Sequence, residues 1–167
     1  MAAEGVRSDP YRGFNFKVIV DGLISDARFA KVSGLNTEIE VVEYREGTDN
    51  TTMRKLPGLV SYDNITLERG ISQNSELIEW YDAVIEAIGG IPSAVSQNGL
   101  DGNFRKDVTI QLLTRNGEAA REWKLSKAWP CKLAIGDLDA SSSDTIMETI
   151  ELCHEGLTVS DLATSTS

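Results

Sequence analysis

The sequence predicts a mainly β domain that carries a single α-helix. Apolar residues alternate with polar ones over short segments, which is the pattern of half-buried strands. Turn signals separate these segments, and Asn116-Gly117 is the strongest hairpin signal among them. Only the segment near 75–88 shows helical spacing of its apolar residues. Many short strands with one amphipathic helix fit a barrel or a sandwich, with the helix packed over one opening or edge.

The N-terminal half of the sequence supplies the first four expected strands. The first runs from Phe14 to Val20 and places four apolar side chains on one face. The second begins near Phe29 and is interrupted at Gly34, where a glycine predicts a bulge or a bend at a barrel corner. The third and fourth are expected over 37–44 and 64–69.

The helix is expected over Ser75 to Ile88, because apolar residues recur there at spacings of three and four and form one stripe. Asn74 or Ser75 can cap its start. The pair Gly89-Gly90 is expected to end the helix, and Pro92 blocks its continuation.

The C-terminal half predicts two strands joined by the Asn116-Gly117 turn. A short strand over 129–135 and a last strand over 146–157 follow. Pro130 cannot donate a ladder hydrogen bond, so we expect it at a strand start, an edge or a bulge. The tail after residue 157 is rich in Ser, Thr and Ala and is expected to fray.

The overall composition fits one domain. The chain has 167 residues and a net charge of −10, which argues against a protein that wraps nucleic acid through clustered Lys and Arg. The first residues lack the apolar region of a secretory signal peptide, and no run approaches the length of a membrane span. We therefore expect synthesis in the cytosol, no membrane partner, and buried thiols rather than a disulfide at Cys131 and Cys153.

The sequence offers little for catalysis. His154 is the only histidine, and its neighbour Cys153 points to the opposite face of a strand, so the two cannot form a nucleophile–base pair. No phosphate loop, dinucleotide fingerprint, nucleophile elbow, zinc-protease motif or calcium loop occurs. We expect neither an enzyme nor a bound cofactor or metal.

The segment from Val41 to Gly70 holds the most informative feature. Between two strands it carries the polar run Arg45 to Arg54, in which Met53 is the only core-forming residue. A tight hairpin needs only about two to five connecting residues. The length and composition of this run predict a loop that is disordered in the free protein and becomes ordered against a partner.

The same region makes the sequence recognisable, because EYREGTDNTTMRKLPGLVSYDNITLERG resembles the tail-tube proteins of contractile-tail phages and related contractile injection systems. Four further segments agree in the expected order: DPYRGFNFKVIVDGL, FAKVSGLNTEIEVVEYREG, KAWPCKL and ETIELCHEGL. Unrelated β-proteins have no reason to share all five. The resemblance implies a small β-barrel with one flanking α-helix that assembles into stacked six-membered rings. It implies a flexible N-terminal arm over 1–8, the tube-type domain over 9–157 and a flexible C-terminal tail over 158–167.

Two groups of residues become candidate sites under this resemblance. The first is a loop that reaches the next ring, with both charge signs available for a partner: Arg45, Glu46, Asp49, Asn50, Arg54 and Lys55. The second is a set of strand carboxylates that would give the channel a negative wall: Glu38, Glu40, Glu68 and Glu151. Like charges across a narrow aqueous pore would hinder sticking of DNA or acidic cargo. The alternative places these carboxylates on the outside or at contacts between subunits.

The function implied by the resemblance is structural: an inner-tube subunit of a contractile tail or injection machine. It would polymerise into a hollow tube that conducts DNA or protein cargo. The expected partners are further copies of the chain in hexameric rings, a surrounding sheath, and baseplate or hub proteins. The expected location is the cytoplasm during assembly and then a virion tail or an extracellular or cell-associated injection particle. Two alternatives stay open: a secreted haemolysin-coregulated-type ring of a type VI system that carries effectors, and a monomeric ligand-binding barrel.

Overall fold

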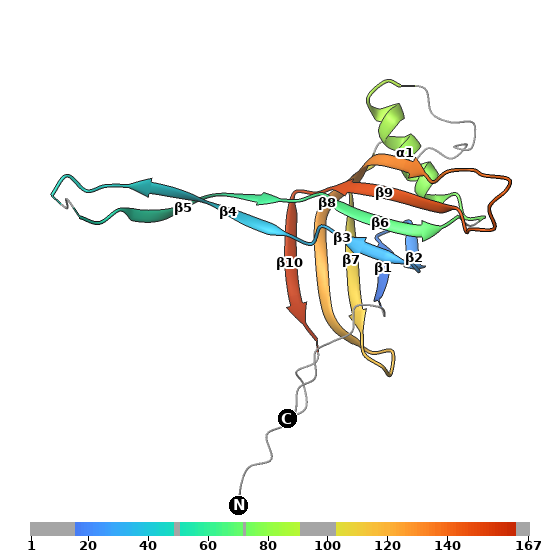
Figure 1. The fold of residues 1–167 in the computed structure, drawn as a ribbon, viewed down its shortest axis with the longest axis horizontal. Coiled ribbons are helices and arrows are strands. Elements are labelled where there is room, and N and C mark those ends of the chain that lie inside the picture. Colours follow the sequence, from blue (N-terminus) through green and yellow to red (C-terminus); the bar gives the residue numbers. More distant parts are fainter. Residues whose placement is uncertain (1–15, 49–50, 72, 91–102, 163–167) are drawn as a thin grey trace, which may run out of the picture.

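The computed structural model describes residues 16–48, 51–71, 73–90 and 103–162 (Figure 1). Strands dominate this part of the chain, and one helix lies near its middle. The mainly β fold class with a single helix is therefore confirmed. The elements in chain order are β1 (Phe16–Val20), β2 (Ile24–Ala27), β3 (Lys31–Ser33), β4 (Thr37–Tyr44), β5 (Arg54–Tyr62), β6 (Ile65–Gly70), α1 (Glu76–Ala87), β7 (Lys106–Leu113), β8 (Ala119–Ile135), β9 (Met147–Cys153) and β10 (Gly156–Asp161).

One long strand joins the two halves of the main sheet. β8 has 17 residues, and its first part pairs with β7 and β10 while its second part pairs with β9. The strand order is β2-β1-β7-β8-β9-β6-β3, with β10 alongside β8. Within the described residues the ends of this order do not pair with each other, so the sheet curves around the core without closing into a hydrogen-bonded barrel. Every pairing in it is antiparallel.

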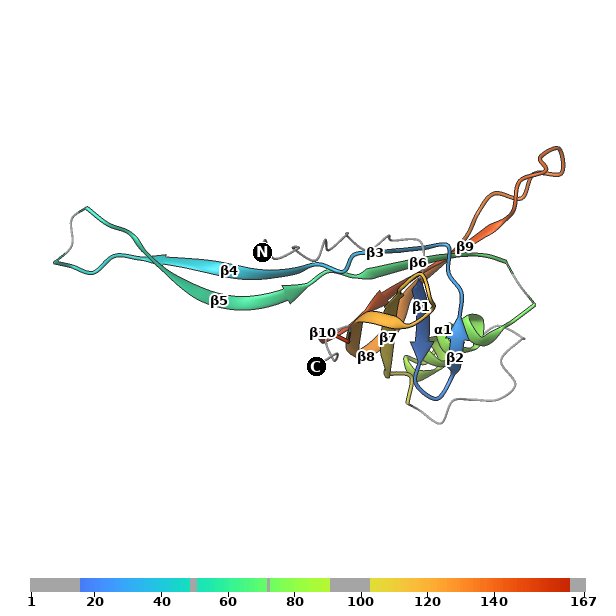
Figure 2. The same cartoon turned by 90° about the horizontal axis from the view of Figure 1, so that it is seen from below.

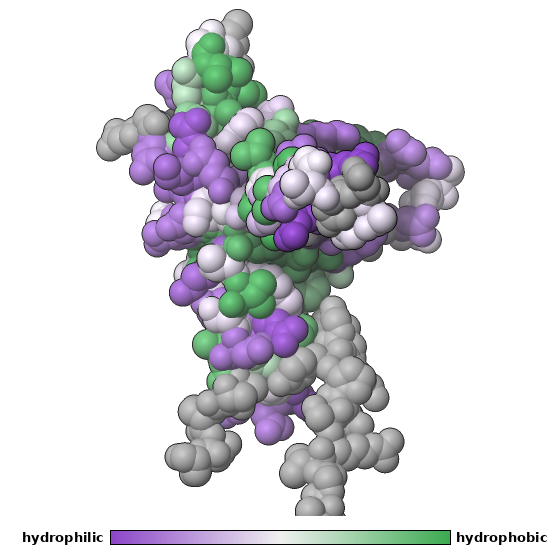
Figure 3. Space-filling view, turned by 90° about the vertical axis from the view of Figure 1, so that its left-hand side faces the viewer, coloured by the Kyte–Doolittle hydropathy of each residue, from purple (hydrophilic) through white to green (hydrophobic). Residues whose placement is uncertain are grey.

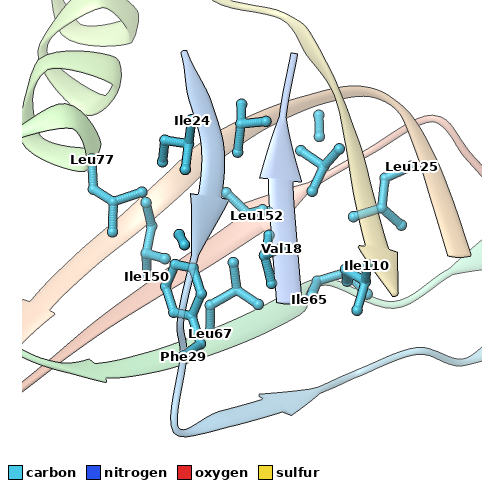
Figure 4. Packing of buried hydrophobic residues seen from close by; sticks show 14 of the residues in the cluster. Val18, Ile24, Phe29, Ile65, Leu67, Leu77, Ile110, Leu125, Ile150 and Leu152 are labelled. Carbon is cyan, nitrogen blue, oxygen red and sulfur yellow. The ribbon is translucent and has the colours of Figure 1, made fainter. Parts of the chain in front are cut away.

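The core lies inside this curved sheet, where one face of each strand is apolar. Figure 4 shows side chains from β1, β2, β6, β7, β8 and β9 pointing toward one another, with Leu77 of α1 beside them. The fully buried members include Val18, Ile65, Leu125 and Leu152. Burial alternates along β6 and β9 residue by residue, as the period of a half-buried strand requires.

The helix packs against β8 through its apolar stripe. Its Trp80 is fully buried and donates its indole N–H to the carbonyl oxygen of Phe104 at 2.6 Å. Gly89 follows the helix with φ +80, the left-handed conformation that ends helices and favours glycine. Ser75 lies at the N-cap position, but its hydroxyl bonds the carboxylate of Glu79 rather than a backbone N–H. The predicted helix is confirmed to within one residue at each end.

Three segments differ from the sequence prediction. The strand expected over 129–135 is the second part of β8, and a register shift between Pro130 and Lys132 accommodates the missing N–H. The strand expected over 146–157 is two strands, β9 and β10, separated by a corner. Residues 158–161, which were expected in the C-terminal tail, belong to β10 and pair with β8.

A long hairpin of β4 and β5 extends away from the body of the molecule (Figures 1 and 2). The two strands pair from Thr37–Tyr62 at the root to Tyr44–Arg54 near the tip. Sequence analysis did not predict β5, because it assigned 45–54 to a loop and placed the next strand at 64–69. The connection is instead only 45–53, and β5 occupies the segment that follows it.

Candidate assembly surfaces

The long hairpin, defined here as residues 37–62, is not covered on either face by the described part of the chain. Apart from Tyr44 and Tyr62, every residue of β4 and β5 is exposed. Figure 3 views the molecule from the end at which the hairpin projects, and it shows hydrophobic surface beside hydrophilic surface there. An isolated two-stranded ribbon is marginally stable in water. Exposed apolar side chains on such a ribbon are therefore typical of a surface that a partner covers.

The two hairpin faces differ in chemistry. Directly opposed residues of an antiparallel pair share a face, so the pairs Ile39–Val60 and Val41–Pro57 form one contiguous apolar surface, here called the apolar hairpin face. Its Ile39, Val41 and Val60 are 52%, 57% and 47% exposed.

The opposite face, here called the mixed hairpin face, alternates charged and apolar groups. It carries Glu38 and Glu40 near the root and the pair Val42–Leu56 farther out. Between these two parts the register shifts at Gly58, where a Cβ would lie 3.1 Å from the carbonyl oxygen of Glu40. A side chain at this position would therefore push the neighbouring strand away by a few tenths of an ångström.

The predicted inter-ring loop residues lie at the hairpin tip, although two of them are strand residues. Arg54 opens β5 and approaches Glu46 at 3.7 Å, with both side chains about half exposed, so the ion pair contributes little stability. Lys55 lies opposite Glu43 across the hairpin. Arg45 is exposed at the end of β4. Asp49 and Asn50 lie outside the described residues.

The four predicted lumen carboxylates fall on two separate surfaces. Glu38 and Glu40 belong to the hairpin. Glu68 and Glu151 lie on the outer face of β6 and β9, because their neighbours along each strand are buried on the core face.

The pairing of β3, β6, β8 and β9 places Glu68 and Glu151 near each other and places a lysine opposite each of them. Glu68 lies opposite Lys31 and Thr149, and Glu151 lies opposite Thr66 and Lys132. Glu151 also accepts a hydrogen bond from the Asn64 amide at 2.8 Å. The surface that holds both carboxylates therefore carries charges of both signs.

The structure shows a second polar face, on β7 and β8, that the sequence did not predict as a candidate site. On β7 and β8, Gln111 donates to Glu122 at 2.7 Å and Lys124 lies 3.1 Å from the same carboxylate. The Gln111 hydrogen bond, with help from Lys124, lowers the pKa of Glu122 although its burial acts to raise it. Alternation in 106–126 already placed these residues away from the core, but it could not show that they touch.

Three of the described strands of the body have an open edge. β2 and β3 end the two sides of the sheet order, and β10 pairs with β8 alone. Val159 of β10 is 55% exposed, and Leu162 just beyond is 45% exposed. An edge strand presents unpaired backbone donors and acceptors and is a template for pairing with another chain.

The histidine and the two cysteines, which were considered for catalysis, are described by their contacts within the fold. The ring of His154 bonds two backbone carbonyls and packs against Tyr62. Cys131 and Cys153 are free thiols. The Cys131 thiol donates to the carbonyl oxygen of Glu151 at 3.4 Å, and burial raises its pKa, which keeps it protonated.

Two kinds of feature are absent from the described residues: a metal-binding cluster and a membrane-spanning helix. No group of three or more His, Cys, Asp or Glu side chains in that part of the chain is placed to hold a metal ion. Its one helix is too short and too polar to cross a bilayer.

Comparisons with known proteins identify a family and several similar structures. The model of the T4-like virus tail tube protein gp19 family matches residues 12–158. A search of curated proteins finds no match. Among solved structures, the chain is similar to a chain in the cryo-EM sheath–tube complex of the PVC extracellular contractile injection system in its extended state. The identity is 29% and the TM-score 0.70, with 92% of this chain and 93% of that chain covered.

Two further structures extend the comparison. A chain in the 6-fold symmetrised cryo-EM structure of the anti-feeding prophage baseplate is 26% identical with a TM-score of 0.74, covering 94% of this chain and 99% of that chain. Hcp1 from Salmonella typhimurium is 8% identical with a TM-score of 0.53, covering 91% and 89%, which shows a shared fold alone. Because the family model matches most of the sequence, the chain belongs to the T4-like virus tail tube protein gp19 family.

Proposed function

We propose that the chain is the inner-tube subunit of a contractile tail or injection machine, and that it polymerises into hexameric rings stacked as a hollow tube. The observation that carries the proposal is the long hairpin, whose apolar face has no cover within the described chain. Similarity to chains of a sheath–tube complex and of a 6-fold symmetrised baseplate supports the same assembly.

The ring forms through the open edges of the body. A head-to-tail contact between two different edges closes into a ring when the rotation between copies fits. β2 and β10 supply two such edges on the same curved sheet. Pairing across them would satisfy backbone groups that a single copy leaves exposed.

The long hairpin links each copy to its neighbours. Removing one of its large apolar side chains completely from water would contribute about 1.5–3 kcal/mol. Ile39, Val41 and Val60 lie side by side on a surface that bears no charge until Glu43 and Lys55, so this face packs on a neighbouring subunit. The tip residues Arg45, Glu46, Asp49, Asn50, Arg54 and Lys55 then reach the next ring.

The tube acts as a conduit rather than as a catalyst. DNA or protein cargo passes through the lumen, and a sheath and a baseplate or hub contact the outside and the end of the tube. Similarity to a chain of a sheath–tube complex and to a chain of a baseplate supports these partners. Copies assemble in the cytoplasm and then form part of a virion tail or an extracellular or cell-associated particle. The domain over 9–157, extended by the rest of β10 to Asp161, builds the wall, and the terminal segments 1–8 and 162–167 contact neighbouring copies.

Sedimentation and electron microscopy of the purified full chain test the proposal. We expect species far larger than the 18.2 kDa monomer, seen as rings or rods, either alone or after addition of baseplate components. A chain that stays monomeric even with baseplate components would contradict it.

A further inference from the structure

The side chain of His154 lies at the joint between the long hairpin and the body. His154 directly follows β9, and Asp63 directly follows β5. The Nε2 atom of the ring lies 3.1 Å from the carbonyl oxygen of Asp63. Its Nδ1 atom lies 3.1 Å from the carbonyl oxygen of Gly156, the first residue of β10. One imidazole therefore spans the end of the hairpin and the β9–β10 corner.

Both partners of this ring are acceptors only. A carbonyl oxygen accepts hydrogen bonds, and a neutral imidazole has one N–H donor and one lone pair. With a neutral ring, one of the two contacts would set a nitrogen lone pair against an oxygen. A protonated ring donates at both nitrogens, and hydrogen bonds from a charged donor are the stronger kind. The observed pair of contacts is the one that an imidazolium satisfies fully.

We propose that His154 is a proton-dependent latch that fixes the long hairpin to the body when its ring is protonated and releases it when the ring is neutral. The consequence for assembly rests on the proposed function, because the hairpin reaches neighbouring subunits only in a tube. The latch itself is a property of the single chain.

Other contacts give the joint two further anchors. The Tyr62 ring lies 5.4 Å from the His154 ring, centroid to centroid, at 50° between planes. The Asn36 amide donates to the Asp63 carboxylate at 3.0 Å, and the Asp63 N–H donates to the Asn36 carbonyl oxygen at 3.3 Å. Asn36 precedes β4, so both strands of the hairpin meet the body here. The Tyr62–His154 ring contact and the His154 bond to Asp63 both join the hairpin to the β9–β10 corner. Of these two contacts, only the hydrogen bond depends on a proton.

The charged groups on the neighbouring segments are mostly acidic. The hairpin side contributes Asp63 and the phenol of Tyr62. The body side contributes Glu151 and Glu155, and Lys127 of β8 forms an ion pair with Glu155 at 3.5 Å. Three carboxylates and one ammonium thus lie on the segments that meet at this joint. The thiol of Cys153 lies next in sequence.

Nuclear magnetic resonance of the full chain tests the latch directly. His154 is the only histidine in the sequence, so its Cε1–H resonance follows one ring without ambiguity. The chain is labelled and held at a concentration where sedimentation shows single subunits. The pH is lowered from about 8 to 5, the range in which imidazoles change charge, and the ring resonance is followed for a transition. The backbone amides of β4 and β5 should lose fast motion with the same midpoint, and the ring ¹⁵N shifts should show two protonated nitrogens at low pH.

Two variants separate the latch from a general effect of pH. His154→Gln is neutral at every pH, and His154→Phe keeps a ring against Tyr62 but has no donor. Both should lose the pH dependence of the hairpin amides, while the amides of β9 serve as an internal reference.

Three outcomes would overturn the proposal. The ring resonance could show no transition in this range, the motion of the β4 and β5 amides could stay the same across the transition, or the amides of the His154→Gln variant could still change with pH. If the variants fail to fold, the wild-type ring shifts alone decide. Tube formation is measured separately by sedimentation. Failure of the latch proposal would therefore not contradict the proposed function.

Discussion

Arg69 and Glu148 form a buried ion pair across β6 and β9, with 3.0 Å between Nε of the arginine and Oε2 of the glutamate. Their side chains are only 8% and 6% exposed. Arg69 also donates to the carbonyl oxygen of Asn74 before the helix and lies over the ring of Phe29 at 5.7 Å. One cation thus connects the sheet, the start of the helix and the segment before β3.

We expect Arg69→Ala to destabilise the subunit by about 3–5 kcal/mol, because it leaves the Glu148 carboxylate buried without its partner. The double variant Arg69→Met with Glu148→Leu removes both charges and should recover most of that loss. Urea unfolding of unassembled subunits, followed by circular dichroism, measures the free energy of unfolding. Equal losses in the single and double variants would contradict the account.

Gly34 gives a second test, because it joins β3 to the long hairpin with φ +89. A Cβ at this position would lie 2.1 Å from the carbonyl oxygen of Asn64. We expect Gly34→Ala to cost at least about 2 kcal/mol, from the left-handed backbone and from the displaced β5–β6 corner. Gly47→Ala is the matched control, since a Cβ there meets nothing within 4 Å. Similar unfolding midpoints for the two variants would be evidence against this explanation.

Local pattern predicted the body of the fold well. β6 and β9 alternate buried and exposed residues, and the helix presents one apolar stripe, so each element carries its own signal. β5 lacks such a signal because the residues of its ribbon are exposed on both faces up to Tyr62. Pro57 and Gly58 are also residues that the interior of a strand disfavours. Both are accommodated because a two-stranded ribbon has two open edges and a register shift at that point.

The candidate sites depended more on register than on pattern. Alternation along each strand places Glu68 and Glu151 away from the core, and the sequence grouped them with Glu38 and Glu40. Only the pairing of β3, β6, β8 and β9 shows that Lys31 and Lys132 lie opposite the first two carboxylates. Glu38 and Glu40 lie apart from Glu68 and Glu151 because they belong to the hairpin. The position of the hairpin relative to the body is set by tertiary structure.

The apolar hairpin face yields a prediction about assembly. Replacing Ile39 and Val60 by serine should leave the stability of the single subunit nearly unchanged, because both side chains are about half exposed there. The same change should block tube elongation, because the neighbour loses its apolar contact. Val42→Ser with Leu56→Ser is the matched control, a cross-strand pair of similar exposure on the mixed hairpin face. Pelleting assays compare the two, and equal elongation would exclude the apolar face as the docked one.

Glu122 makes the stability of the subunit depend on pH. Its pKa is lowered from 4.5 chiefly by the Gln111 hydrogen bond, so the carboxylate stabilises the folded state above pH 4.5. This contribution is lost as pH falls through 4.5 toward the lower pKa of the folded state. We expect Glu122→Gln to flatten the acid side of the stability profile between about pH 5 and 3. Glu118→Gln, in the exposed β7–β8 turn, is the control, and a profile for Glu122→Gln that parallels the wild type would contradict the assignment.

The last prediction concerns the wall of the proposed channel. If the outer face of β6 and β9 lines the bore, its charge is set by Glu68 and Glu151 against Lys31 and Lys132. Replacing both glutamates by glutamine leaves the lysines unbalanced in every ring. The wall then becomes positive, and DNA should be retained by the tube rather than repelled, more strongly at low salt. Co-sedimentation of DNA with assembled tubes at two ionic strengths measures this.

Two comparisons decide whether that face is the wall. Glu38→Gln with Glu40→Gln removes the same charge from the hairpin rather than from the outer face of β6 and β9, so it should leave DNA retention low. Lys31→Gln with Lys132→Gln should lower retention further, because only carboxylates remain on the face. A map of the assembled tube gives the direct answer: we expect the Glu68 and Glu151 carboxylates to point into the bore. If both point away from it, the channel wall must be a different face, and the polar surface around Gln111, Glu122 and Lys124 becomes the next candidate.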